Sequence, residues 1–173
     1  MDLFILRHGK AETPGKGMAD EERSLTKKGQ GDILAVALWM ALQEYQFDVI
    51  AASPLIRAQE TAAIVVETLG GPKKVATWEC LVPGGDPDTV CHEISRFPKD
   101  NRILIVGHEP LLSTLISRII TGGEGAGIVM TKGGLAKIRN FSFTGLPSGE
   151  LHWLITAKQM AETGALEFTS KKQ

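Results

Sequence analysis

The order of short apolar runs and amphipathic stretches constrains the fold of this chain most strongly. Residues 102–108, RILIVGH, are almost continuously apolar, as in strands that are buried on both faces of a sheet. Residues 3–6 and 47–54 contain similar runs, and helix-like stretches with apolar residues three and four positions apart lie between them. This alternation predicts an α/β sheet, mostly parallel, with helices on both faces.

The remaining pattern fixes the expected elements. We expect helices at residues 26–46, 54–70, 86–97 and 109–121, a third strand at 73–79 and two last strands at 135–143 and 149–157. Gly145, Pro147, Ser148 and Gly149 are turn signals between the last two strands, which we expect to pair antiparallel at one edge. The predicted fold is therefore a three-layer α/β/α domain covering residues 1–173.

Composition excludes several classes of protein. A formal net charge of -1 and a pI near 6.4 give no support for binding to nucleic acid or to an anionic membrane. Cys80 and Cys91 have no CxxC spacing and are expected to be reduced thiols. No secretory signal is visible at the N-terminus, and the longest apolar run, residues 33–42, is too short to span a bilayer. We therefore expect a cytoplasmic protein.

Three expected strands end in polar groups that suit one ligand. The first leads into Arg7 and His8, the second into Ser53 and, one helical turn later, Arg57, and the fourth into His108. Ligands of open α/β sheets bind beyond the carboxyl ends of the strands. Two guanidiniums and two imidazoles at one point repel each other unless an anion lies among them, and guanidinium forks match phosphoryl oxygens. The sequence therefore predicts a phosphate site.

Other phosphate and metal chemistries are not supported. The chain has no Walker-type glycine loop, which argues against a nucleoside triphosphatase. His92 and His152 do not have metal-ligand spacing to His8 or His108. We expect neither a metal nor a cofactor.

The ordered motifs resemble a known family. RHG at residues 7–9, SPLIRAQETA with Arg57 and VGHEP with His108 are similar to the signature of the histidine phosphatase superfamily. RHGKAE, the segment 20–23 followed by SLTKKG, and PGGD at residues 83–86 narrow the resemblance to its SixA-type phosphohistidine phosphatases. The resemblance runs from about Leu3 to about Trp153 and implies a phosphoglycerate mutase-like fold.

The resemblance also implies a mechanism. His8 would attack phosphorus to form a phosphohistidine intermediate, which water hydrolyses, while Arg7, Arg57 and His108 bind the phosphoryl oxygens. The strand-end geometry suggests that Gly9 leaves room for a backbone carbonyl to orient His8. Ser53, Asp20 and Arg23 are the further candidates for substrate binding. Asp20 and Arg23 line the mouth of the pocket or form a solvated loop pair.

The sequence leaves three alternatives for the general acid that protonates the leaving group. Glu79 lies in the region where many relatives carry a glutamate, although shifted by one position. Glu109 follows the second histidine, where the other branch of the superfamily carries an acidic residue. The third alternative is that no carboxylate is needed, because a protonated imidazole leaves phosphorus far more readily than an alkoxide.

Three functions follow. The first is a metal-independent phosphatase for phosphohistidine on a protein, such as a phosphotransfer domain or phosphocarrier. The second is a phosphomonoesterase for a small metabolite, and the third is a phosphoprotein-binding module without catalysis. Retention of His8 argues against the third function, because binding alone does not need a nucleophile.

Overall fold

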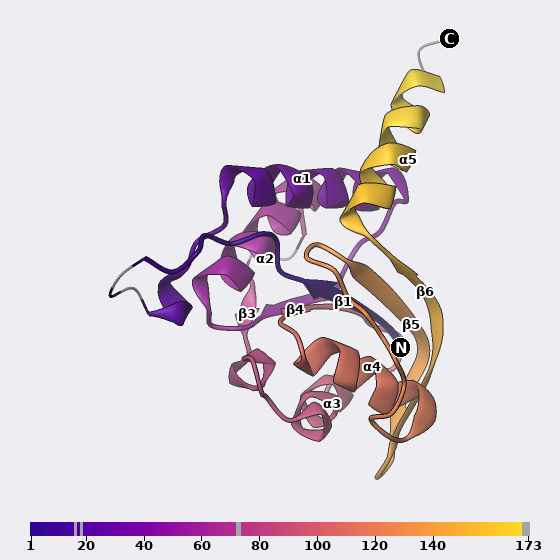
Figure 1. Cartoon of the computed structure of the whole chain (residues 1–173). Coiled ribbons are helices and arrows are strands. Elements are labelled where there is room, and N and C mark those ends of the chain that lie inside the picture. The colour runs from indigo at the N-terminus through magenta and orange to yellow at the C-terminus, as the bar shows by residue number, and fades with distance from the viewer. Residues whose placement is uncertain (16, 18, 72–73, 171–173) are drawn as a thin grey trace.

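A mixed sheet forms the centre of the computed structural model, which describes residues 1–15, 17, 19–71 and 74–170 (Figure 1). Its strands are β1 (Asp2–Arg7), β2 (Val49–Ala52), β3 (Ala76–Thr77), β4 (Arg102–Gly107), β5 (Leu135–Phe143) and β6 (Pro147–Ile155). They lie in the order β3-β2-β4-β1-β5-β6, with parallel pairing from β3 to β1 and antiparallel pairing from β1 to β6. The predicted sheet with an antiparallel edge is confirmed.

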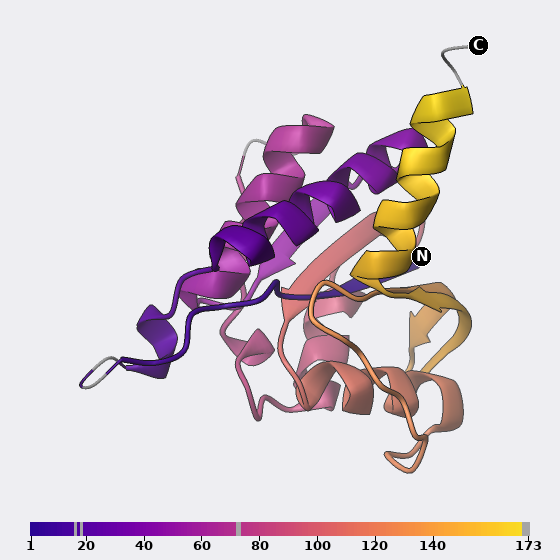
Figure 2. The ribbon, with the colours of Figure 1, turned by 45° about the horizontal axis from the view of Figure 1, so that its top comes forward.

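Helices cover both faces of this sheet (Figures 1 and 2). One face carries α1 (Lys27–Leu42), α2 (Ile56–Leu69) and α5 (Ala157–Ser170), and the other carries α3 (Pro87–Ser95) and α4 (Leu111–Thr121). Two short 3-10 helices, η1 (Asp20–Glu22) and η2 (Glu79–Leu81), lie in the connections. The three-layer prediction is therefore confirmed. Within the described residues, the helices are too short or too polar to cross a membrane.

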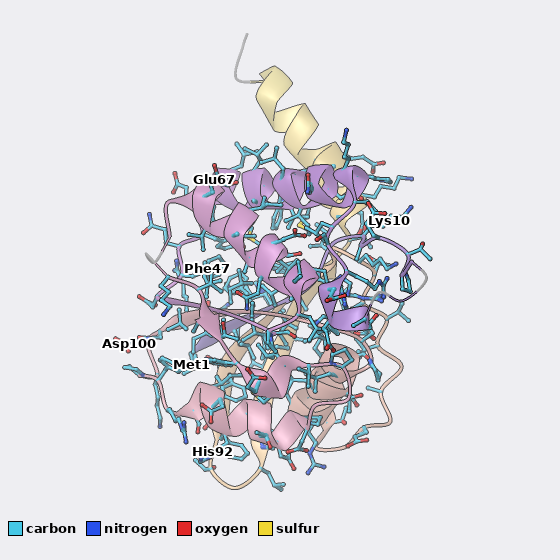
Figure 3. The ribbon with its side chains drawn as sticks, turned by 90° about the vertical axis from the view of Figure 1, so that its left-hand side faces the viewer. Met1, Lys10, Phe47, Glu67, His92 and Asp100 are labelled. Atoms are coloured by element: carbon cyan, nitrogen blue, oxygen red, sulfur yellow. The ribbon has the colours of Figure 1, made fainter. Side chains whose placement is uncertain are left out.

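The side chains of β1 point alternately into two hydrophobic cores. Phe4 and Leu6 belong to the core beneath α1 and α2, whereas Leu3 and Ile5 belong to the core beneath α3 and α4. All four are fully buried, and side chains fill the space between the sheet and both helical layers (Figure 3). The strand is therefore held from both faces, and its C-terminal end has a fixed position.

The helix ends follow the local sequence signals. The Thr26 hydroxyl accepts a hydrogen bond from the Gly29 N–H at 2.9 Å and caps α1. Asp86 caps α3 in the same way, because its carboxylate accepts from the Thr89 N–H at 2.8 Å. Helix α2 ends at Gly70, whose φ of 64° lies in the left-handed region.

The last strand begins two residues earlier than predicted. We expected a strand over residues 149–157 after turn signals at Gly145, Pro147, Ser148 and Gly149, but β6 covers Pro147–Ile155. Gly149 lies in the strand, where a Cβ atom would come within 2.7 Å of Ile138 Cγ2 and 2.9 Å of Ile119 Cγ2. This glycine is therefore required by the close approach of a neighbouring strand and of α4, and the turn itself is shorter than predicted.

Two other elements differ from the expectation. The third strand was predicted over residues 73–79; Lys73 lies outside the described residues, and β3 covers two residues that pair with β2. Helix α5 was not predicted. Of its described side chains, only Met160 is buried. A single buried anchor produces little helical periodicity, so the sequence carries almost no signal for this helix.

The start of α1 packs tightly against the segment that follows β1, beside Lys10 (Figure 3). The Thr26 N–H donates to the Lys10 carbonyl oxygen at 2.9 Å, and a Cβ atom on Gly29 would overlap that same oxygen. Two positions later, Gly31 is exposed and has no atom within 4 Å of a Cβ built on it. There is therefore no room for a side chain at Gly29, whereas there is room for one at Gly31.

We predict opposite effects of alanine at these two positions. Gly29→Ala forces backbone atoms apart and should lower the free energy of unfolding by about 1–3 kcal/mol. Gly31→Ala removes backbone freedom from the unfolded chain and should raise it by up to about 1 kcal/mol. Urea unfolding of both variants measures the two values. Equal effects at the two positions would contradict the tight packing at Gly29.

Candidate active site

The C-terminal ends of β1, β4 and β2 bring the predicted polar residues to one edge of the sheet. Arg7 lies opposite Gly107 in the β1–β4 pairing, and the His8 N–H donates to the Gly107 carbonyl oxygen at 3.1 Å. Ser53 follows β2 at the same edge. The rings of His8 and His108 are both buried, with centroids 4.8 Å apart. The structure therefore brings together the strand ends that the sequence predicted to converge.

A backbone carbonyl orients His8. Its Nδ1 lies 2.7 Å from the Gly9 carbonyl oxygen, which can only accept, so Nδ1 carries the proton and Nε2 keeps its lone pair. A Cβ atom at Gly9 would come within 2.7 Å of Ile33 Cγ1 and 3.0 Å of the Gly29 carbonyl oxygen. Only glycine fits at this point, and its carbonyl is thereby fixed against the imidazole.

The surroundings of His8 keep its imidazole neutral. The pKa of His8 is lowered to about 4, chiefly by burial and further by the charges of Arg57, Arg7 and Lys132, against the opposing effect of the hydrogen bond to Gly9. At neutral pH the side chain is therefore an uncharged nucleophile with a free Nε2 lone pair.

His108 is neutral for similar reasons. Its pKa is lowered to about 3, chiefly by burial and then by His8 and Arg57, whereas the carboxylate of Asp20 acts in the opposite direction. Within the described part of the chain, neither ring nitrogen of His108 has a hydrogen-bond partner. A neutral imidazole has one N–H that can donate to an anion.

Arg7 is held by a segment that precedes β5. Its Nη1 donates to the Met130 carbonyl oxygen at 2.7 Å, and its backbone bonds to Gly133 and Gly134 at 3.1 Å and 3.0 Å. Burial lowers the pKa of the guanidinium, and the nearby negative charge of Glu109 raises it. The side chain remains a cation whose position is set by residues 130–134.

Arg57 lies in the first turn of α2, is 4% exposed and binds Asp20. Its Nη1 donates to the Asp20 carbonyl oxygen at 2.6 Å, and its Nη2 donates to the carboxylate at 2.8 Å. Arg23 donates to the other carboxylate oxygen at 2.6 Å. These hydrogen bonds, first from Arg23 and then from Arg57, lower the pKa of Asp20. The loop containing η1 is thereby tied to the site, and binding of substrate by Asp20 and Arg23 stays a prediction.

The other predicted residues have different surroundings. The Ser53 hydroxyl is fully buried and accepts from the Leu55 N–H at 3.4 Å, at the start of α2. Glu109 accepts from the Ser113 N–H at 3.1 Å, in the first turn of α4. Glu79 is exposed on η2, and its carboxylate makes no hydrogen bond to the described residues. The charge of Glu109 raises the pKa of Arg7 at the end of β1.

Sequence reasoning missed two contributions to the site. It gave no role to residues 122–134, whereas Met130 holds Arg7 and Lys132 lowers the pKa of His8. It also did not foresee that Asp20 is the partner of Arg57. The basic residue in an otherwise glycine-rich segment was the available signal for Lys132.

The assembled groups suit a dianion. Two guanidiniums supply charge and forked donors, and two neutral imidazoles supply a nucleophile and a further donor. Among the residues that the structure describes, no three side chains of His, Cys, Asp or Glu are grouped so that they could hold a metal ion.

Known proteins share this fold. The family model described as the histidine phosphatase superfamily (branch 1) matches residues 3–82. The phosphohistidine phosphatase SixA homolog of Haemophilus influenzae is 30% identical over 128 residues, which are 69% of this chain and 77% of that protein.

Two solved structures confirm the expected phosphoglycerate mutase-like arrangement. The protein histidine phosphatase SixA, complexed with tungstate, matches with a TM-score of 0.81 and 24% identity, over 91% of this chain and 98% of that chain. The phosphoserine phosphatase of Entamoeba histolytica, in complex with 3-phosphoglyceric acid, matches with a TM-score of 0.65 and 19% identity, over 92% and 98%. At these identities the two structures show the fold alone.

We predict that His8 and His108 stay neutral far below the ordinary pKa of histidine, which is 6.5. Their ring resonances in NMR spectra should titrate near pH 4 for His8 and pH 3 for His108. His8→Gln and His108→Gln variants assign the resonances. A midpoint near 6.5 for either ring would contradict the proposed effect of burial.

The same shifts set the pH dependence of stability. Because both folded-state pKa values lie below 6.5, the unfolded chain binds more protons than the folded chain as the pH falls from 6.5 toward 4. The titration of these two histidines therefore leaves the free energy of unfolding unchanged above pH 6.5 and lowers it below that pH. The two glutamine variants should show a smaller loss of unfolding free energy over this window.

Proposed function

The chain belongs to the histidine phosphatase superfamily, and from this premise we propose that it is a SixA-type phosphohistidine phosphatase. The observation that supports this most directly is the pair of buried neutral imidazoles, 4.8 Å apart, with Arg7 and Arg57 on the same edge of the sheet. The Haemophilus influenzae relative is a phosphohistidine phosphatase SixA homolog, which supports phosphohistidine as the substrate class. The proposed partner is a phosphotransfer domain or a phosphocarrier protein.

In the first step, His8 Nε2 attacks phosphorus and a new P–N bond forms. The bond from phosphorus to the leaving nitrogen of the substrate histidine breaks and its electron pair stays on that nitrogen; the proton already on the other ring nitrogen makes the leaving imidazole neutral. Nδ1 of His8 is held by Gly9, so the attacking nitrogen points away from this carbonyl. In the second step, water attacks phosphorus, the P–Nε2 bond breaks and its electron pair returns to Nε2, and inorganic phosphate leaves with the protons of the water.

Arg7, Arg57 and His108 bind the three equatorial oxygens in this proposal. The two guanidiniums carry the positive charge that the phosphoryl group requires, and His108 donates from a ring nitrogen. A bound dianion opposes the guanidinium charges that lower the pKa of His108. His108 therefore takes up a proton more readily when the phosphoryl group is present, and an imidazolium is a stronger donor to an anion than a neutral imidazole.

A strong general acid is not required for this substrate. Glu109 already accepts a helix N–H, and Glu79 is exposed. The imidazole of phosphohistidine leaves phosphorus readily once its free nitrogen is protonated, whereas an alkoxide leaves slowly without a proton donor.

The second candidate function is hydrolysis of small phosphate esters. It is favoured by the fold shared with the phosphoserine phosphatase of Entamoeba histolytica.

The test of the proposed intermediate is a single-turnover quench with a phosphocarrier protein labelled on histidine. We expect acid-labile, base-stable label on the native chain and on His152→Ala, an exposed control position. His8→Ala should take up no label. If neither the native chain nor His8→Ala is labelled, although both bind the carrier, the protein is a binding module instead.

The test of substrate class compares phosphohistidine with phosphoserine peptides. We expect phosphohistidine hydrolysis at least about 10²-fold faster, since general acid catalysis contributes about 10²–10⁴-fold to ester cleavage. Glu109→Gln and Glu79→Gln should change phosphohistidine hydrolysis by no more than about threefold. A large loss in one variant would identify that glutamate as the acid, and equal rates on both substrates would favour the phosphomonoesterase.

A further inference from the structure

A single buried hydroxyl connects the two segments that carry the proposed nucleophile and its arginine. Thr61 is fully buried in α2, one turn after Arg57. Its Oγ1 donates to the Arg57 carbonyl oxygen at 2.7 Å and accepts from the Gly9 N–H at 3.2 Å. The hydroxyl therefore bonds to the backbone of both catalytic segments.

The hydrogen bonds form one continuous series. The Gly9 N–H is held by Thr61, and the Gly9 carbonyl oxygen accepts from His8 Nδ1 at 2.7 Å. Both backbone polar groups of Gly9 are thereby fixed, one by α2 and one by the nucleophile itself. Among the residues that the structure describes, this hydroxyl is the one hydrogen-bonded connection between Gly9 and α2.

The same helix contains an internal comparison. Thr68 also donates to the carbonyl oxygen four residues earlier, Ile64, at 2.8 Å. Threonine side chains in helices commonly make this hydrogen bond, and the bond indicates no function by itself. Thr61 differs from Thr68 because its oxygen also accepts a bond from another segment, which reaches the His8 ring in one further step.

We propose that Thr61 is a positioning residue, whose hydroxyl sets the place of His8 relative to Arg57. The inference rests on the proposed function, in which His8 attacks phosphorus held by Arg57. Without the hydroxyl, the buried Gly9 N–H loses its acceptor, and the carbonyl that orients His8 is no longer held from α2. The phosphoryl-binding groups themselves remain, so turnover suffers more than binding.

The experiment compares Thr61→Val, which keeps the shape and removes the hydroxyl, with Thr61→Ser, which keeps the hydroxyl. Thr68→Val is the matched control on the same helix. We expect Thr61→Val to lower kcat by about 10–100-fold with KM changed by no more than about threefold, since small misplacements of reacting groups cost up to about 10²-fold. Thr61→Ser should recover most of the rate, and Thr68→Val should equal the native chain.

A second readout is independent of turnover. The Nδ1–H resonance of His8 in NMR spectra should shift or exchange faster in Thr61→Val and stay unchanged in Thr68→Val. Urea unfolding of each variant shows that the folded population is the same at assay conditions. If the native chain forms no phosphoenzyme but the His8 resonance still responds to Thr61→Val, the proposed function fails and the positioning role stands.

Three results would overturn the inference. Native kcat together with a native His8 resonance in Thr61→Val would show that the hydroxyl positions nothing. An equal loss of kcat in Thr68→Val would show that the effect comes from the stability of the helix and not from positioning of His8. A rate in Thr61→Ser as low as in Thr61→Val would show that bulk, and not the hydroxyl, is what matters.

Discussion

The site depends on the parallel pairing of β1 with β4. This register places Arg7 opposite Gly107 and bonds the His8 N–H to the Gly107 carbonyl oxygen. His8 and His108, which are about one hundred residues apart in the sequence, therefore lie side by side at this edge, with ring centroids 4.8 Å apart. Both strands are buried on both faces, so a one-residue shift of register would move their side chains into the opposite core and disrupt the packing of both cores.

Burial gives this arrangement its chemical character. Two imidazoles that were charged beside Arg7 and Arg57 would repel each other and the guanidiniums, and the low pKa values of about 4 for His8 and about 3 for His108 remove that repulsion. Asp20 offsets the remaining positive charge from the solvent side, because its carboxylate bonds Arg57 and Arg23. The fold thus keeps a nucleophile uncharged among cations and holds one of those cations with a carboxylate from a neighbouring loop.

Sequence reasoning found the strand ends because their signals are local. An apolar run that stops at Arg7 and His8 needs no knowledge of the rest of the chain, and the parallel topology then predicts that His108 lies nearby. It missed the contacts that depend on tertiary packing, such as Met130 on Arg7 and Asp20 on Arg57. Sequence reasoning also started the last strand two residues late, because Pro147 and Ser148 are turn-forming residues locally and belong to the strand only through their pairing with β5.

The buried polar atoms without a hydrogen-bond partner show which part of the fold is least stabilised. Among the described residues, the buried side-chain atoms without a hydrogen-bond partner are Arg7 Nε and both ring nitrogens of His108. Each such group costs about 1–3 kcal/mol, and all three lie at the carboxyl edge of β1 and β4. The two hydrophobic cores, built from fully buried aliphatic and aromatic side chains, offset this cost. An oxygen-rich anion at that edge supplies the missing acceptors, so occupancy of the site and stability of the whole sheet are linked.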